Sequence, residues 1–251
     1  GRELFKAELP QRFDKKQEAH DFLKDCIAAA FEINSLEKKP AKRSPSAPFT
    51  TSTLQQEASR KLGFSVARTM QVAQRLYEAG HITYMRTDSV NLSDTAIESA
   101  RAEIVNAYGD KYHKQRQYRT KSAGAQEAHE AIRPTYFSNH SVDADASEKR
   151  LYELIWKRAI ASQMSEAEFE KTVAKILIST RAEEFVANGE IMKFDGFLKV
   201  YMESMDEDQE GGLDNDGDNA LLPPLAKGQA LQLNDLSATE RFSRPPARFT
   251  E

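Results

Sequence analysis

Two side chains near the middle of the sequence, Tyr84 and Arg86, have the types and the spacing for chemistry on a phosphate group. Residues 82–86 (I-T-Y-M-R) predict a short strand, and side chains two residues apart on a strand project from the same face. A tyrosine hydroxyl becomes a nucleophile when its proton is removed. A guanidinium can hold two phosphate oxygens and stabilise the charge of the transition state. The pair could therefore bring a nucleophile and a cation to the same phosphate group.

The same residues also have purely structural interpretations. A tyrosine in an apolar strand is most often a half-buried core residue, and Arg86 could form a surface ion pair with Asp88. Three further aromatic residues, Tyr77, Tyr108 and Trp156, lie at core spacing and are predicted to pack rather than to stack on bases. The local pattern alone leaves these alternatives open.

The region around this strand is predicted to be mostly helical. A helix capped by Thr51 or Ser52 ends at Gly63. A second helix, capped by Ser65, ends at Gly80, and the strand follows it. The order helix, glycine turn, helix, strand is the outline of a winged helix-turn-helix. Three more helices are predicted over 93–109 with Ser93 as the cap, over 125–133 with Pro134 as the stop, and over about 147–164.

The two flanks of the helical region are predicted to be mainly β-structure. The proline-rich run 38–48 predicts a linker, and 203–220, which has eight acidic residues and no basic one, predicts a mobile surface loop. The fold class is therefore α+β: an antiparallel β domain over 1–44 and 166–251, interrupted by a mostly helical, winged-helix-like domain over 45–165. Alternating or helical periodicity predicts strands over 2–9, 29–37, 173–179, 184–188, 196–201 and 231–233, and a helix over 15–27.

The composition predicts a globular protein without a membrane span. Of the 251 residues, 39% are hydrophobic and 29% charged, and no apolar run is long enough to cross a bilayer. The single cysteine, Cys26, excludes an internal disulfide and is predicted to be a packed residue, so the cytoplasm is the expected location. Residues 41–165 carry 18 basic and 13 acidic side chains and the remainder 17 and 26, so charge neither indicates nor excludes a nucleic-acid partner.

Four runs, taken together in this order and spacing, resemble the type IA DNA topoisomerases, and among these the bacterial topoisomerase I branch. They are P-F-T-T-S-T-L-Q-Q-E-A at 48–58, A-Q-R-L-Y-E-A-G-H-I-T-Y-M-R-T-D-S at 73–89, Q-E-A-H-E-A-I-R-P-T at 126–135 and P-P-A-R-F-T-E at 245–251. Each run is weak by itself, but the set is specific. The resemblance is strongest over 48–164.

The resemblance implies a catalytic role for Tyr84, which would form a 5′-phosphotyrosyl bond with one DNA strand. The other strand would pass through the break, and religation would relax negative supercoils without ATP. Arg86 would hold the phosphate, His129 would be a further catalytic residue oriented by Asp88, and Glu127 would support the site. On the predicted helix over 125–133, Arg133 lies one turn after His129 and is expected to contact DNA.

The resemblance also implies what this chain does not supply. The family binds Mg²⁺ through an acidic Toprim domain, and no Asp-x-Asp cluster in a parallel α/β setting occurs here, so no metal site is expected in this chain. We therefore expect a central fragment, with the β domain as arch and hinge, that is inactive alone. Its expected partner is single-stranded or underwound DNA, bound as a monomer in the cytoplasm at the nucleoid. A non-catalytic winged-helix DNA-binding module is the alternative.

Overall fold

The chain folds as an α+β protein whose described residues fall into two compact units. The computed structural model describes residues 4–118, 130–202 and 222–242. Among these, the first unit contains 4–41, 169–193 and 222–242, and the second contains 42–118, 130–168 and 194–202. The segment 194–202, which the sequence had assigned to the β domain, thus packs with the helical unit.

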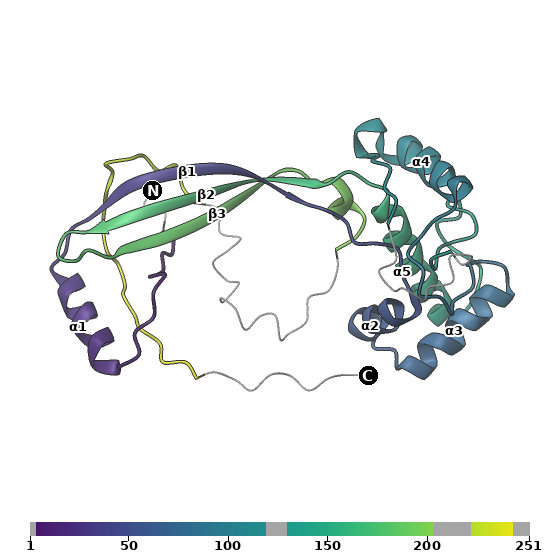
Figure 1. Cartoon of the computed structure of the whole chain (residues 1–251), viewed down its shortest axis with the longest axis horizontal. Coiled ribbons are helices and arrows are strands. Elements are labelled where there is room, and N and C mark those ends of the chain that lie inside the picture. The colour runs from purple at the N-terminus through teal and green to yellow at the C-terminus, as the bar shows by residue number, and fades with distance from the viewer. Residues whose placement is uncertain (1–3, 119–129, 203–221, 243–251) are drawn as a thin grey trace. The chain divides into compact units, whose positions relative to one another are not determined.

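A four-stranded sheet in the order β3-β2-β1-β4 is the main feature of the first unit (Figure 1). Strands β2 and β3 are consecutive in the chain, and β4 pairs antiparallel to β1 with Phe31 opposite Leu231. The strands are β1 (Phe31–Arg43), β2 (Ala167–Ile178), β3 (Glu184–Phe194) and β4 (Ala230–Leu231).

Helix α1 (Lys16–Ile27) covers one end of this sheet (Figure 1). Its buried residues, Phe22 and Cys26, pack against apolar side chains of three strands, so the predicted packing role of Cys26 is confirmed. Burial of these side chains supplies the hydrophobic stabilisation of the unit. The strand members of this core are Phe31, Ile33, Ala174, Ile176, Ile178, Phe185 and Ala187.

The predicted linker over 38–48 is wrong for its first half, because β1 continues through Pro40 to Arg43. Two ion pairs join this part of β1 to β2: Lys38 with Glu170 at 3.9 Å, and Lys42 with Glu168 at 2.8 Å. Proline is tolerated in a strand only where its missing N–H is not needed for the ladder. The partners that extend the strand are more than a hundred residues away in the sequence, so local composition could not reveal them.

Two predicted strands are also absent. Residues 196–201 do not form one, because Gly196–Lys199 is a 3₁₀ helix, η2, and Gly196 has a φ of +50°. A Cβ atom at Gly196 would lie 2.4 Å from the carbonyl oxygen of Glu166, so only glycine fits here. Of the predicted strand over 2–9, the described residues contribute a single bridge, between Glu8 and Val186.

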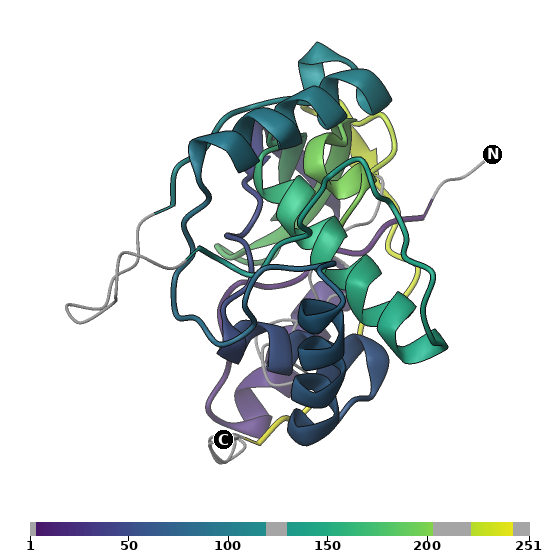
Figure 2. The same ribbon diagram turned by 90° about the vertical axis from the view of Figure 1, so that its right-hand side faces the viewer.

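The second unit is built from helices (Figure 2). Helices α2, α3 and α5 contact one another, and α4 contacts the short 3₁₀ helix η1. Figure 2 shows the teal α4 apart from the blue pair α2 and α3. Among the described helices, none combines the length and hydrophobicity that a bilayer span requires. The helices are α2 (Thr51–Leu62), α3 (Val66–Glu78), α4 (Asp94–Tyr108), η1 (Asp110–Tyr112) and α5 (Ala146–Ser162).

Local capping signals fix most of the helix ends. Ser65 and Ser93 cap α3 and α4 as predicted, each accepting a hydrogen bond from a backbone N–H of the first turn. Gly63 ends α2 in the left-handed region with a φ of 67°. The predicted cap of α2 is wrong by one residue or two, since Thr50 is the N-cap and forms a capping box with Thr53.

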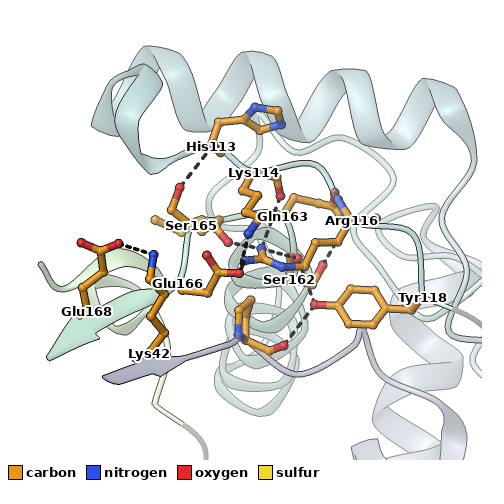
Figure 3. A network of polar contacts seen from close by, with 12 residues as sticks. Lys42, His113, Lys114, Arg116, Tyr118, Ser162, Gln163, Ser165, Glu166 and Glu168 are labelled. Carbon is orange, nitrogen blue, oxygen red and sulfur yellow. Dashed lines mark hydrogen bonds and ion pairs between the residues drawn. The ribbon is translucent and has the colours of Figure 1, made fainter. Parts of the chain in front are cut away.

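A polar network lies between the segment after η1 and the residues that join α5 to β2 (Figure 3). Glu166 accepts a hydrogen bond from Lys114 at 2.6 Å and pairs with Arg116 at 3.1 Å. Its side chain is only 18% exposed. The hydrogen bond from Lys114, followed by the contacts with Arg116, lowers the pKa of the Glu166 carboxyl from 4.5 to about 2.

We expect Glu166→Gln to lower the free energy of unfolding by about 1–2 kcal/mol at pH 7, because two cations lose their carboxylate. The pKa of Glu166 is depressed in the folded chain, so its stabilisation is present above about pH 4.5 and is lost as the pH falls towards 2. The deficit of the variant should therefore shrink with acid. Urea unfolding between pH 7 and pH 3 measures it.

The matched control is Glu153→Gln. It removes an ion pair with Lys157, which lies one helical turn further along the surface of α5. Such exposed pairs contribute about 0.5 kcal/mol or less. An equal loss of stability in both variants would contradict the special role of Glu166.

Candidate active site

The segment that carries Tyr84 is not a strand of a sheet and bends at Thr83 and Met85, so the predicted strand over 82–86 is wrong in detail. Only Ile82 forms a bridge, with Pro134. Side chains along the segment nevertheless alternate: Met85, Thr87 and Ser89 are buried, whereas Tyr84, Arg86 and Asp88 are exposed. Tyr84 and Arg86 are thus both exposed, with the buried Met85 between them. Without a strand here, the described residues contain no β-wing after α3.

The start of α2 holds one part of this segment. The backbone N–H of Thr51 donates to the carbonyl oxygen of Thr87 at 2.9 Å. The hydroxyl of Thr51 accepts from the N–H of Thr87 at 2.9 Å and lies 2.8 Å from the carbonyl oxygen of Met85, to which it can donate. A helix end and an irregular segment therefore satisfy each other's free backbone groups.

Residues 131–135 hold the other part. The N–H of Thr83 donates to the carbonyl oxygen of Arg133 at 2.9 Å. In return, the Thr83 hydroxyl accepts from the N–H of Arg133 at 3.0 Å and donates to the carbonyl oxygen of Ala131 at 2.7 Å. Tyr84 thus lies between two anchored residues, Thr83 and the buried Met85.

The ring of Tyr84 is accessible. The residue is 40% exposed and its hydroxyl has no hydrogen-bond partner among the described residues. The one described ring contact of Tyr84 is with Tyr77, edge to face, with centroids 5.2 Å apart and planes at 65°. Tyr77 is itself 41% exposed, so its predicted place in the core is wrong. Trp156, by contrast, is buried as predicted.

Arg86 and Asp88 are both exposed, and they do not pair with each other. Within the described part of the chain, neither the guanidinium of Arg86 nor the carboxylate of Asp88 makes a hydrogen bond or an ion pair. The alternative prediction, a surface ion pair between Arg86 and Asp88, is therefore wrong. An exposed guanidinium can bind an incoming anion.

Arg133 is turned towards protein groups. Its guanidinium makes two hydrogen bonds to one carboxylate oxygen of Glu130, at 2.6 and 3.2 Å, and the side chain is 13% exposed. The predicted helix over 125–133 is wrong for residues 130–133, which form no helix and contain an isolated bridge from Ile132 to Phe49, while His129 and Glu127 lie outside the described residues. To contact DNA, Arg133 would have to exchange its present partners.

Glu130 ties this segment to the start of α4, a role that the sequence did not reveal. It accepts a hydrogen bond from the backbone N–H of Ser93 at 2.6 Å, besides those from Arg133. Burial alone would raise the pKa of Glu130, but the hydrogen bonds from Ser93 and Arg133 outweigh it and lower that pKa. The partners of Thr51 and Thr83, and the Ser93 partner of Glu130, are 34 to 50 residues away, so the local sequence carries no signal of them.

A metal site is not formed by the residues that the structure describes. No group of three or more His, Cys, Asp or Glu side chains among them could hold a metal ion.

Comparisons with known proteins show what this chain is similar to. A family model described as DNA topoisomerase matches residues 2–251. A DNA topoisomerase 1 of Mycolicibacterium smegmatis is 50% identical over 234 residues, covering 89% of this chain and 25% of that protein. A DNA topoisomerase 1 of Zymomonas mobilis is 45% identical over 240 residues, covering 94% and 20%.

A solved structure is also similar. Full-length topoisomerase I from Thermotoga maritima matches with a TM-score of 0.72 and 32% identity, covering 90% of this chain and 37% of that one. The chain thus spans a fifth to a quarter of the length of the two curated relatives named above.

Proposed function

This chain belongs to the type IA DNA topoisomerase family, and on that premise we propose that Tyr84 is the nucleophile of an ATP-independent DNA strand cleavage. The phenolic oxygen attacks the phosphorus of a phosphodiester in one strand. A bond between phosphorus and the tyrosine oxygen forms, the bond to the 3′ oxygen breaks, and the phenolic proton is removed while the 3′ oxygen gains one. The reverse reaction reseals the strand, after the other strand has passed, and relaxes negative supercoils.

Energy balance supports this proposal. One phosphodiester replaces another, so nothing is oxidised or reduced and no nucleotide has to be hydrolysed. A tyrosine side chain has an ordinary pKa near 10, so about one molecule in a thousand is ionised at neutral pH. Cleavage therefore needs a proton acceptor and a cation at the phosphate. We assign the cation to Arg86, on the exposed face of the same segment.

The observation that supports the proposal most directly is the accessible phenol on an anchored backbone. Tyr84 is 40% exposed, yet the residues on both sides of it are fixed by hydrogen bonds or burial. A winged helix that recognises a DNA sequence does not require an exposed phenol on an anchored backbone. The alternative of a non-catalytic DNA-binding module is therefore less well supported.

The remaining site assignments belong to the same proposal. His129 would assist proton transfer with Asp88 as its orienting partner, and Glu127 would support the site. DNA contact by Arg133 is kept as a prediction from the resemblance. Mg²⁺ is proposed as the cofactor of the complete enzyme, and because the described residues do not fit a metal, no step above depends on it. Single-stranded or underwound DNA is the proposed substrate, bound by a monomer in the cytoplasm at the nucleoid.

Covalent trapping tests the proposal. The full-length protein that contains these residues is incubated with single-stranded DNA and Mg²⁺, denatured, and digested with nuclease and protease. Mass spectrometry should find a phosphate-linked nucleotide on the peptide with Tyr84. Tyr77 and Tyr136, which are 41% and 63% exposed, serve as internal controls. Attachment to either control, or to none of the three, would refute the assignment.

We further expect these 251 residues alone not to relax supercoiled DNA, since they span a fifth to a quarter of the two relatives compared above. Weak, salt-sensitive binding of single strands should persist, because contacts with the DNA backbone dominate such binding. Gel assays of relaxation and titrations at several salt concentrations measure the two properties. Efficient relaxation by this chain alone would be the contrary result.

A further inference from the structure

One hydroxyl, that of Thr51, connects the two peptide groups that flank Arg86. It accepts from the N–H of Thr87 at 2.9 Å and lies 2.8 Å from the carbonyl oxygen of Met85. These are the peptide groups before and after Arg86, and in a sheet a neighbouring strand would bind such groups. Among the residues that the structure describes, no strand lies beside the segment at this point. The threonine side chain takes the place of that strand.

Thr51 is not needed for the helix cap. The cap of α2 consists of Thr50 and Thr53, each of whose hydroxyls accepts from the backbone N–H of the other. The Thr51 hydroxyl points instead to the segment 85–87. Thr51 and Thr53, two residues apart at the start of α2, therefore make different hydrogen bonds. A substitution of one can remove its hydrogen bonds and leave those of the other.

The position of the backbone around Arg86 matters for a phosphate clamp. The guanidinium itself has no hydrogen-bond partner among the described residues, so nothing there fixes its place except the backbone that carries it. Arginine has a long side chain with many rotamers, and small displacements of a reacting group reduce rates steeply. The hydrogen bonds of Thr51 restrict the motion of the main chain on both sides of Arg86. They therefore narrow the range of positions that the guanidinium can reach.

We propose that Thr51 is a positioning residue for strand cleavage, because its hydroxyl fixes the peptide groups on both sides of Arg86 and so sets the phosphate clamp relative to Tyr84. This inference rests on the proposed function of Tyr84 and Arg86. Thr51 itself touches no reacting atom.

The test compares Thr51→Val with Thr53→Val in the full-length protein. Thr51→Val keeps the shape and removes the hydroxyl, and we expect the rate of covalent attachment at saturating DNA to fall by about 10- to 100-fold. DNA affinity should stay within about threefold, because the loss concerns the transition state. Thr51→Ser should restore most of the rate. Thr53→Val, which weakens the cap of the same helix, should leave the rate nearly unchanged.

An unchanged rate in Thr51→Val, an equal fall in Thr53→Val, or no rescue by serine would each overturn the proposal. If Thr51→Val does not fold, Thr51→Cys takes its place, since a thiol is a weak donor and acceptor and should give a partial loss. Comparison with Thr51→Ser then decides.

A measurement without DNA separates this proposal from the function on which it rests. Hydrogen exchange of the Thr87 amide, followed by NMR, should be faster in Thr51→Val and unchanged in Thr53→Val. If the wild-type protein forms no covalent adduct with DNA, the proposed function is refuted. If the Thr87 amide exchanges at the same rate in Thr51→Val as in the wild type, the positioning role of Thr51 is refuted.

Discussion

Tyr84→Phe is expected to reduce covalent attachment of DNA by at least about a thousandfold, the scale on which loss of a nucleophile acts. Phenylalanine keeps the ring and its edge-to-face contact with Tyr77, and removes only the oxygen that attacks phosphorus. The hydroxyl of Tyr84 has no partner among the described residues, so its loss should not affect folding. The measurement is the fraction of labelled DNA that stays with the protein after denaturation.

The control for this experiment is Tyr77→Phe. Tyr77 is as exposed as Tyr84 and lies beside it, so the substitution tests whether any phenol on this surface can react. We expect full attachment in Tyr77→Phe and unchanged binding of single strands in both variants. Persistent attachment in Tyr84→Phe would mean that another residue is the nucleophile.

Arg86→Ala is expected to lower the rate of attachment at saturating DNA by about 100- to 1000-fold, the usual cost of removing a group that stabilises transition-state charge. Arg86 lies on the exposed face with Tyr84, so its guanidinium can bind the phosphate that the phenol attacks. The salt dependence of DNA binding should weaken by about one counterion, because one phosphate contact is lost. Single-turnover cleavage and binding titrations at several salt concentrations measure the two effects.

Two further variants separate geometry from charge. Arg86→Lys keeps the charge but cannot hold two oxygens in a plane, so the rate should lie between those of the wild type and Arg86→Ala. Arg101→Ala removes an exposed arginine of α4 that pairs with Glu98, and should leave cleavage unchanged. Equal loss in Arg86→Ala and Arg101→Ala would show that only net charge matters.

The predicted site is supported by hydrogen bonds that regular secondary structure does not provide. Thr51 and Thr83 use their hydroxyls to bind backbone groups of segments 34 to 50 residues away. An irregular segment held in this way can expose alternate side chains while its backbone stays satisfied. Such a segment can present a nucleophile and a phosphate clamp on a fixed backbone without burying either one.

The sequence by itself determined the features that depend on neighbours in the chain. Ser65 and Ser93 cap their helices, and Gly63 ends α2, because caps and left-handed turns involve residues a few positions apart. The common exposed face of Tyr84 and Arg86 was also predictable. Exposed and buried side chains alternate here as they would on the predicted strand, although the segment is not a strand of a sheet.

Only the tertiary structure decided which distant groups pair. It paired Glu130 with the backbone of Ser93, it left Tyr77 at the surface, and it extended β1 through Pro40. It also placed Thr51 on the backbone around Arg86. A hydrogen bond or an ion pair depends on separation in space, and residues far apart in the chain become neighbours only when the whole unit has folded.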